Sequence, residues 1–208
     1  MRTETINVYK LDELSAEARE TAIRSQQDFL AEMWDPEFTY DYYEEKLQEA
    51  GFENAKINYS GFYSQGDGAS FTADINLKVY VQKLIERYKA VDLQKVNEER
   101  KQEVKFILHY LPRVIKLENE FNFRVVRFTT RYVHENTCCV ESNHYHSHQR
   151  LDALREKLKS EIEFDRINFC REIYRDLKMD YEAQTDEAAA IASIEANEYE
   201  YTADGKIF

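Results

Sequence analysis

The sequence predicts an α+β protein, in which an antiparallel sheet built from hairpins and terminal strands packs with several helices. Two stretches alternate apolar and polar side chains on both sides of a turn, as β-hairpins do: residues 55–78 and 121–145. Other stretches repeat apolar side chains every three or four residues, as amphipathic helices do. A chain of 208 residues suits one domain, residues 1–208, with a helical elaboration at about residues 79–120.

The N-terminal elements are predicted from alternation and helix caps. Residues 3–9 alternate and predict a half-buried strand that begins the chain. Ser15 is the predicted cap of a helix that ends near Trp34, and Pro36 permits a second helix that ends at Gly51. The first helix is expected to bury one apolar stripe, which consists of Ala18, Ala22, Phe29 and Met33, with Ile23 and Leu30 beside it.

The stretch YSGFYSQGDGASFT, residues 59–72, holds three of the five glycines. Dinucleotide-binding and P-loop motifs need other glycine spacings, so we interpret the stretch as the turn of the first hairpin. Asp67-Gly68 is a dipeptide that accepts positive φ, so a β-branched residue at Gly68 should be strained. A ligand-binding loop remains the alternative, because polar side chains lie at the predicted tip.

The second half of the chain predicts helices around the second hairpin. Residues 79–116 predict two helices with a break near residues 90–92, and residues 121–137 predict a strand that pairs with residues 138–145. Residues 148–182 predict the longest helix, followed by another through Ala196 and a C-terminal strand. Asp165 interrupts the apolar stripe of the longest helix, so we expect it to pair with a cation such as Arg131 or to be exposed.

The charge of the chain limits its partners. The formal net charge is −12, although residues 78–132 carry 13 basic and 7 acidic side chains. Affinity for nucleic acid depends on cations that neutralise phosphates, so we expect no direct nucleic-acid binding except through residues 78–132.

The apolar runs and cysteines of the sequence also indicate the cellular compartment of the protein. No apolar run reaches 18 residues, and the stretch MRTETINVYK contains no apolar signal, so we expect a cytoplasmic protein without membrane contact. Three cysteines without a secretory signal indicate reduced thiols, and one of Cys138 and Cys139 should be buried. No residue pattern implies a cofactor or names a catalytic residue.

The predicted binding surface is acidic. The helix after Pro36 gathers four carboxylates on the side opposite its apolar residues: Asp41, Glu44, Glu45 and Glu49. Tyr63, Gln65 and Asp67 at the hairpin tip complete the predicted contact set for a protein with a basic surface. The alternative is that these carboxylates form an ordinary solvated helix face.

Histidines give a metal alternative. His144, His146 and His148 form HxHxH, with His134 upstream, and on a strand this spacing would direct three imidazoles to one side. A metal-dependent enzyme is therefore one hypothesis. A polar connector between strand and helix is the competing interpretation.

Four stretches carry a family resemblance: INVYKLDELSAEARETAI, YSGFYSQGDGASF, YVHEN and IEANEYEYTADGKIF. Together they resemble a family of small proteins carried by bacteriophages and prophages, some of which are labelled antitoxin-like. The resemblance implies action on host machinery inside the host cell, as an inhibitor of a defence or nucleic-acid-handling protein of the anti-CRISPR or antirestriction type. The alternative that it implies is an antitoxin-like protein that neutralises a toxin.

Overall fold

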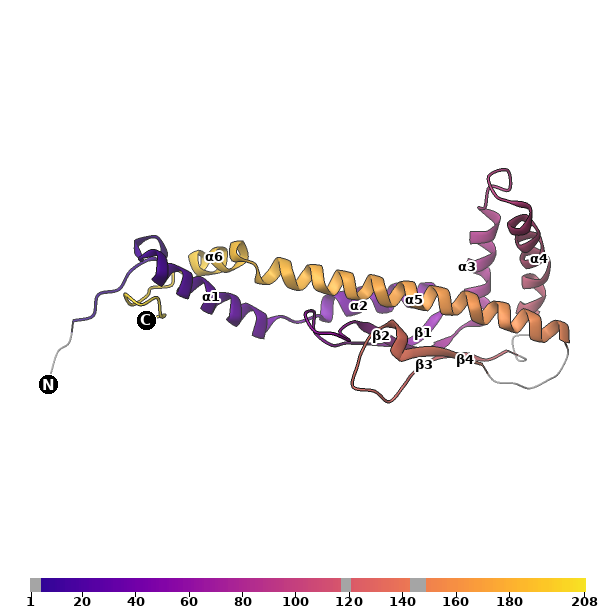
Figure 1. Ribbon diagram of the computed structural model, residues 1–208, viewed down its shortest axis with the longest axis horizontal. Coiled ribbons are helices and arrows are strands. Elements are labelled where there is room, and N and C mark those ends of the chain that lie inside the picture. Colours follow the sequence, from indigo (N-terminus) through magenta and orange to yellow (C-terminus); the bar gives the residue numbers. More distant parts are fainter. Residues whose placement is uncertain (1–4, 117–120, 143–148) are drawn as a thin grey trace. The chain divides into compact units, whose positions relative to one another are not determined.

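Residues 5–116, 121–142 and 149–208 are described by the structure, a computed structural model (Figure 1). The chain divides into two compact units, one of residues 1–36 and 176–208 and one of residues 37–175. Each unit is described by itself below. None of the helices formed by the described residues combines the length and the apolar character that a membrane span requires.

The unit of residues 37–175 contains the sheet. Its strands are β1 (Phe52–Tyr59), β2 (Ala69–Ile75), β3 (Phe123–Arg127) and β4 (Cys138–Ser142), in the order β1-β2-β3-β4. Each pair of neighbouring strands is antiparallel, with Ile57 opposite Phe71 and Val125 opposite Val140. The buried positions alternate along β3, β4 and the second half of β2, because one face of the sheet packs against the core, and the first three residues of β2 are all buried. This arrangement confirms the predicted α+β class.

Helices α2 (Glu37–Glu49), α3 (Leu77–Lys89) and α4 (Glu98–Val114) belong to the same unit, with α5 (Gln149–Thr185) up to Arg175. Asn76 and Asn97 cap α3 and α4, since each side chain accepts a hydrogen bond from a backbone N–H of the first turn. Figure 1 shows α3 and α4 side by side. The predicted break between them is confirmed, and it extends over residues 90–97.

The other unit is built from α1 (Ala16–Met33), the end of α5 and α6 (Glu187–Ala196), with a short 3₁₀ helix, η1 (Leu11–Glu13), before α1. Ser15 caps α1 as predicted. Small residues such as Ala22 and Ala190 let α1 and α6 approach closely around Ile23 and Ile194. Gly205 fits against α1 at φ +81°, where a Cβ would lie 2.2 Å from the carbonyl oxygen of Ala18.

The predicted terminal strands do not join the sheet. Tyr9 and Tyr201 form an isolated bridge, in which each backbone N–H donates to the carbonyl oxygen of the other at 2.9 Å. Ile6 and Val8 are exposed, so the alternation at the N-terminus does not correspond to a half-buried strand, and residues 3 and 4 lie outside the described residues. The reason is that the termini lie in one compact unit and the sheet lies in the other.

The strand predicted over residues 121–137 is shorter than expected. It ends at Arg127, and residues 135–137 form a 3₁₀ turn, η3 (Glu135–Thr137), before β4. The Thr130 hydroxyl accepts a hydrogen bond from the backbone nitrogen of Tyr132. Such local side-chain bonds compete with a strand ladder, which explains the early end.

The apolar stripe predicted for α1 is only half correct. Ala18, Ala22 and Ile23 are buried, but Phe29 is 49% exposed and Met33 is 66% exposed. Helix α6 is short, and Ser193 accepts a hydrogen bond from Gln26, the last buried residue of α1. After Gln26, α1 packs through Leu30, which lies against the core, and Gln27, whose Nε2 donates to the Thr185 carbonyl oxygen at 3.0 Å, and these contacts leave Phe29 and Met33 exposed.

Candidate protein-binding face on helix α2

Helix α2 is oriented by three buried side chains at intervals of four residues, Thr39, Tyr43 and Leu47. This spacing places them one above another on one side of the helix. Gly51 follows the helix at φ +92°, and a Cβ there would lie 2.8 Å from the backbone nitrogen of Tyr80 in α3. Core packing on one side and this close approach at the end fix which side of α2 faces outward.

The outward side of α2 combines carboxylates with aromatic rings. All four predicted carboxylates are exposed. Phe38 and Tyr42, which the sequence interpretation did not include, are 85% and 53% exposed. At about 100° per residue, Phe38 and Tyr42 lie within about 60° of Glu45 and Glu49 around the helix axis. We call this surface the α2 face; it consists of Phe38, Asp41, Tyr42, Glu44, Glu45 and Glu49.

The negative charge of the α2 face is not neutralised locally. Lys46 is the basic residue of α2, and its Nζ lies 2.8 Å from Glu172 of α5 and 5.1 Å from the ring centroid of Tyr43. The same Nζ lies 5.9 Å from the ring centroid of Tyr42, so Lys46 lies at the border between the buried side of α2 and the α2 face. Among residues 5–116, 121–142 and 149–208, none of the four carboxylates of the α2 face forms an ion pair. The face therefore presents its charge to an approaching molecule.

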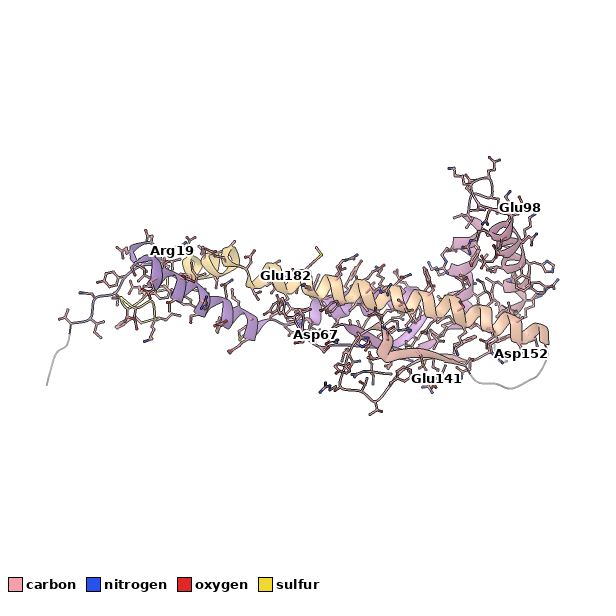
Figure 2. The ribbon with its side chains drawn as sticks, viewed as in Figure 1. Arg19, Asp67, Glu98, Glu141, Asp152 and Glu182 are labelled. Carbon is pink, nitrogen blue, oxygen red and sulfur yellow. The ribbon has the colours of Figure 1, made fainter. Side chains whose placement is uncertain are left out.

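The hairpin tip differs from the prediction in the role of Asp67, which is labelled in Figure 2. Its Oδ2 accepts hydrogen bonds from the backbone nitrogens of Tyr63 at 3.0 Å and Ser64 at 2.7 Å. Asp67 thus stabilises the loop, whereas Tyr63 and Gln65 are the exposed predicted contact residues. Phe62 packs inward, with its ring centroid 5.8 Å from that of Tyr174.

Gly68 does not adopt the positive φ that was expected for the Asp67-Gly68 turn, so that prediction is wrong. Positive φ occurs at Gly61 and Gly66, and not at Gly68. A Cβ on Gly68 would lie 2.6 Å from the Cβ of His134 and 2.8 Å from the carbonyl oxygen of Val133. Gly68 is required because the loop before η3 passes close to its backbone.

Of the four histidines of the metal hypothesis, the structure describes His134 alone. His134 Nδ1 accepts a hydrogen bond from the backbone nitrogen of Asn136 at 3.1 Å, so this imidazole holds the η3 turn. His144, His146 and His148 lie outside the described residues. Within the part of the chain that the structure describes, no three His, Cys, Asp or Glu side chains are grouped as metal ligands.

Asp165 is paired, but with Arg87 and not with Arg131. Arg87 Nη1 donates to Asp165 at 2.6 Å, and the Tyr80 hydroxyl donates to the same carboxylate at 2.7 Å. Burial and the Asp165 carboxylate raise the pKa of Tyr80 far above its ordinary value, so the phenol stays protonated. These groups attach α3 to α5, and beside them a hollow of about 330 Å³ extends to Glu49 of the α2 face.

A buried arginine and thiol cluster lies between β4 and α5. Arg166 donates from Nη1 to Cys138 Sγ at 3.0 Å and from Nη2 to Glu163 at 2.6 Å. The hydrogen bond from the Cys170 thiol and the charge of Arg166 lower the pKa of Cys138 to about 7. Cys138 is buried and Cys139 is half-buried, which confirms the prediction for this pair. Because Cys138 is only 2% exposed, its sulfur serves the packing of the unit.

Comparison with known proteins identifies the family to which the chain belongs. Residues 34–187 match the family described as Domain of unknown function (DUF8835). The chain belongs to this family. The DUF8835 match contains α2, the sheet, α3, α4 and α5, so the α2 face lies within it. No curated protein and no solved structure matches the chain. The DUF8835 description assigns no activity, so the exposed residues of the α2 face are the basis for the proposed function.

Phe38 and Tyr42 could have been found from the sequence. They are spaced i and i+4, and they lie out of phase with the stripe of Tyr43 and Leu47. An aromatic pair on the polar side of an amphipathic helix is a signal for a contact surface. The sequence interpretation counted only the carboxylates on the side of this helix opposite its apolar residues.

Proposed function

We propose that this DUF8835 protein is a protein-binding module whose α2 face docks on a basic surface of a partner protein. One observation carries the proposal. Four exposed carboxylates without ion pairs among the described residues share α2 with two exposed aromatic rings, and Glu45 and Glu49 lie within about 60° of both rings around the helix axis. Aromatic anchors surrounded by polar groups are the usual composition of an interface centre and its rim.

The two kinds of side chain have different roles in this proposal. Burial of a side chain of the size of Phe38 contributes about 1.5–3 kcal/mol, so the rings of Phe38 and Tyr42 supply affinity. The carboxylates attract a basic surface from a distance, raise the rate of association and favour one class of partner. The net charge of −12 adds to this attraction.

The partner class follows from the same chemistry. A protein that binds nucleic acid carries lysine and arginine side chains that contact phosphates, and a row of carboxylates on a helix competes for the same cations. Together with the resemblance to phage-borne proteins, this supports an inhibitor of a host defence or nucleic-acid-handling protein, of the anti-CRISPR or antirestriction type. Its site of action would be the host cytoplasm.

The experiment compares purified variants as bait in lysate of the host cell at low salt. Phe38→Ala/Tyr42→Ala removes the rings, and Glu45→Lys/Glu49→Lys reverses two charges of the α2 face. Asp28→Lys/Glu32→Lys is the matched control, because it makes the same change in charge at i and i+4 on the exposed side of α1. We expect wild type and the control to retain the same basic protein, with both α2 variants weakened at least about tenfold.

Salt provides a second readout. Capture by wild type should fall steeply between low and high salt, because the screening length shrinks from about 10 Å at 0.1 M to about 3 Å at 1 M. Equal capture by wild type and both α2 variants would remove the proposal. So would loss of the partner with the α1 control alone.

A further inference from the structure

Helix α4 carries a surface of the opposite sign. Its side away from the buried residues Val104, Ile107 and Leu111 displays cations and aromatic rings. We call it the α4 face; it consists of Lys105, Phe106, His109, Tyr110, Arg113 and Lys116. Phe106 is 41% exposed, and its ring centroid lies 4.6 Å from that of Tyr110. Arg113 lies over the Tyr110 ring at 5.6 Å.

None of the six residues of the α4 face is acidic, whereas Glu98 and Glu99, in the first turn of α4, lie on the same side of the helix seven residues before Lys105 and Phe106. Glu103 borders the face, one turn before Phe106 and two turns before Tyr110, and it accepts hydrogen bonds from Arg100 and Lys157. Glu98, labelled in Figure 2, lies in the first turn of α4 and accepts a hydrogen bond from Lys101. Among the residues that the structure describes, Lys105, Arg113 and Lys116 form no ion pair. The positive charge of the face is therefore available to a partner.

The α2 and α4 faces match each other in three properties. Their charges are opposite, each contains two aromatic side chains, and each extends over eleven residue steps; the α2 face is about 17 Å long, and the α4 face continues past Val114, the last residue of α4, to Lys116. From this complementarity we infer that the α4 face binds the α2 face of a second copy of this chain. Reciprocal contacts give a closed dimer, and successive contacts give a chain of copies.

A second copy fits the α4 face better than nucleic acid does. Nucleic acid carries one phosphate about every 3.4 Å along each strand and continues past any short basic patch. Here it would continue onto a protein with 40 acidic and 28 basic side chains, which repels it. An α2 face places four carboxylates within the length of the α4 face, and its rings can pack against Phe106 and Tyr110.

This inference goes beyond the proposed function, because it assigns a second surface and a second partner. The second copy and the foreign partner would compete, since both bind the α2 face. In the self-associated form the α4 face of a second copy would cover the α2 face until a partner with a more basic surface displaces that copy.

The test is sedimentation equilibrium of the purified full-length chain at low and high salt. We expect the average mass to rise with concentration up to about 200 μM at low salt, and less at high salt. Lys105→Glu/Arg113→Glu and Glu45→Lys/Glu49→Lys should each raise the dissociation constant at least about tenfold. Lys78→Glu/Lys89→Glu, on exposed positions of α3, is the control with the same change in charge and should behave as wild type.

Mixing the two charge-reversal variants, or combining their substitutions in one chain, distinguishes loss of the interface from loss of folding. An equimolar mixture of the two defective variants should associate, because the unchanged α4 face of one meets the unchanged α2 face of the other. The chain with all four substitutions should also regain association, to within about threefold of wild type. Recovery in either case shows that the single-face variants are folded.

Two results would overturn the inference. One is a monomer at every concentration and at both salt concentrations. The other is a monomer that binds a labelled single-stranded oligonucleotide and loses that binding with Lys105→Glu/Arg113→Glu, which would assign the α4 face to nucleic acid. The proposed function fails separately, through equal capture of a foreign partner by wild type and both α2 variants.

Discussion

Single side chains in this protein acquire their roles from neighbours that are distant in the sequence. The Asp67 carboxylate was a plausible contact group from its position at a turn, but it holds the backbone of its own loop. Asp165 was predicted to need a cation, and the structure supplies Arg87 from a helix that lies 78 residues earlier. Sequence periodicity identifies which residues are unusual. It does not identify the partner, because the partner is set by packing between elements.

A prediction at this scale concerns Gly68. Gly68→Ala should lower the free energy of unfolding by about 1–3 kcal/mol, because the added Cβ would collide with His134 and with the backbone of Val133. Urea denaturation measures this. Gln65→Ala, an exposed change in the same loop, should stay within about 0.5 kcal/mol of wild type. Equal stability of the two variants would contradict the close approach at Gly68.

The Cys138 thiol provides a second prediction. Its pKa of about 7 lies below the ordinary 9.0, so its ionisation contributes stability that is present above pH 9 and is lost as the pH falls through 7. Ultraviolet thiolate absorbance of the folded protein should show one titration near pH 7 that is absent in Cys138→Ala. A titration that persists in Cys138→Ala would assign the thiolate to another cysteine.

Whole elements were predicted more successfully than their contacts. The apolar period of α5, the Ser15 cap of α1 and the residues that bound α2, Pro36 and Gly51, were sufficient to place these helices, since local sequence determines helix ends. The strand at residues 121–137 was predicted too long, because local hydrogen bonds at Thr130 and His134 compete with the ladder. The α2 face was half predicted. Its carboxylates were recognised from their spacing, and Phe38 and Tyr42 were missed, although their i, i+4 spacing out of phase with Tyr43 and Leu47 was visible in the sequence.

The attachment of α3 to α5 predicts a response to alkali. The Tyr88 hydroxyl donates to Glu161 at 2.7 Å, and burial together with this bond raises the pKa of Tyr88 to about 12. A raised pKa contributes stability that is complete below the ordinary value of 10.0 and is lost as the pH rises through 12. Urea midpoints should therefore fall over this range in wild type. Tyr88→Phe should fall less, with the remaining loss due to Tyr80, and an identical decline in both proteins would refute the assignment.

At the scale of the whole molecule, two compact units share one long helix. Helix α5 contributes residues to both units. The sequence suggested one domain because no linker composition interrupts residues 1–208, and this expectation stays a prediction. The DUF8835 match spans residues 34–187, so it includes the sheet-containing unit and leaves out most of α1 and α6.

Calorimetry tests the single-domain prediction. One cooperative transition is expected, because unfolding of either unit would disrupt α5. Leu177→Ala removes a fully buried side chain from the part of α5 in the terminal unit, and it should cost about 2–5 kcal/mol and shift the entire transition. Two transitions, of which only one moves in Leu177→Ala, would show two domains.

The central claim is that the α2 face binds a foreign protein, and site-specific photocrosslinking tests it most directly. A photoreactive phenylalanine analogue replaces Tyr42 on the α2 face or, as the control, Phe29 on α1, which is exposed to a similar extent. After irradiation in the host cell, the account predicts one dominant crosslinked protein with a basic surface from position 42, none from position 29, and loss of the product with Glu45→Lys/Glu49→Lys. Equal crosslinking from both positions, or a product that survives the charge reversal, would contradict the account.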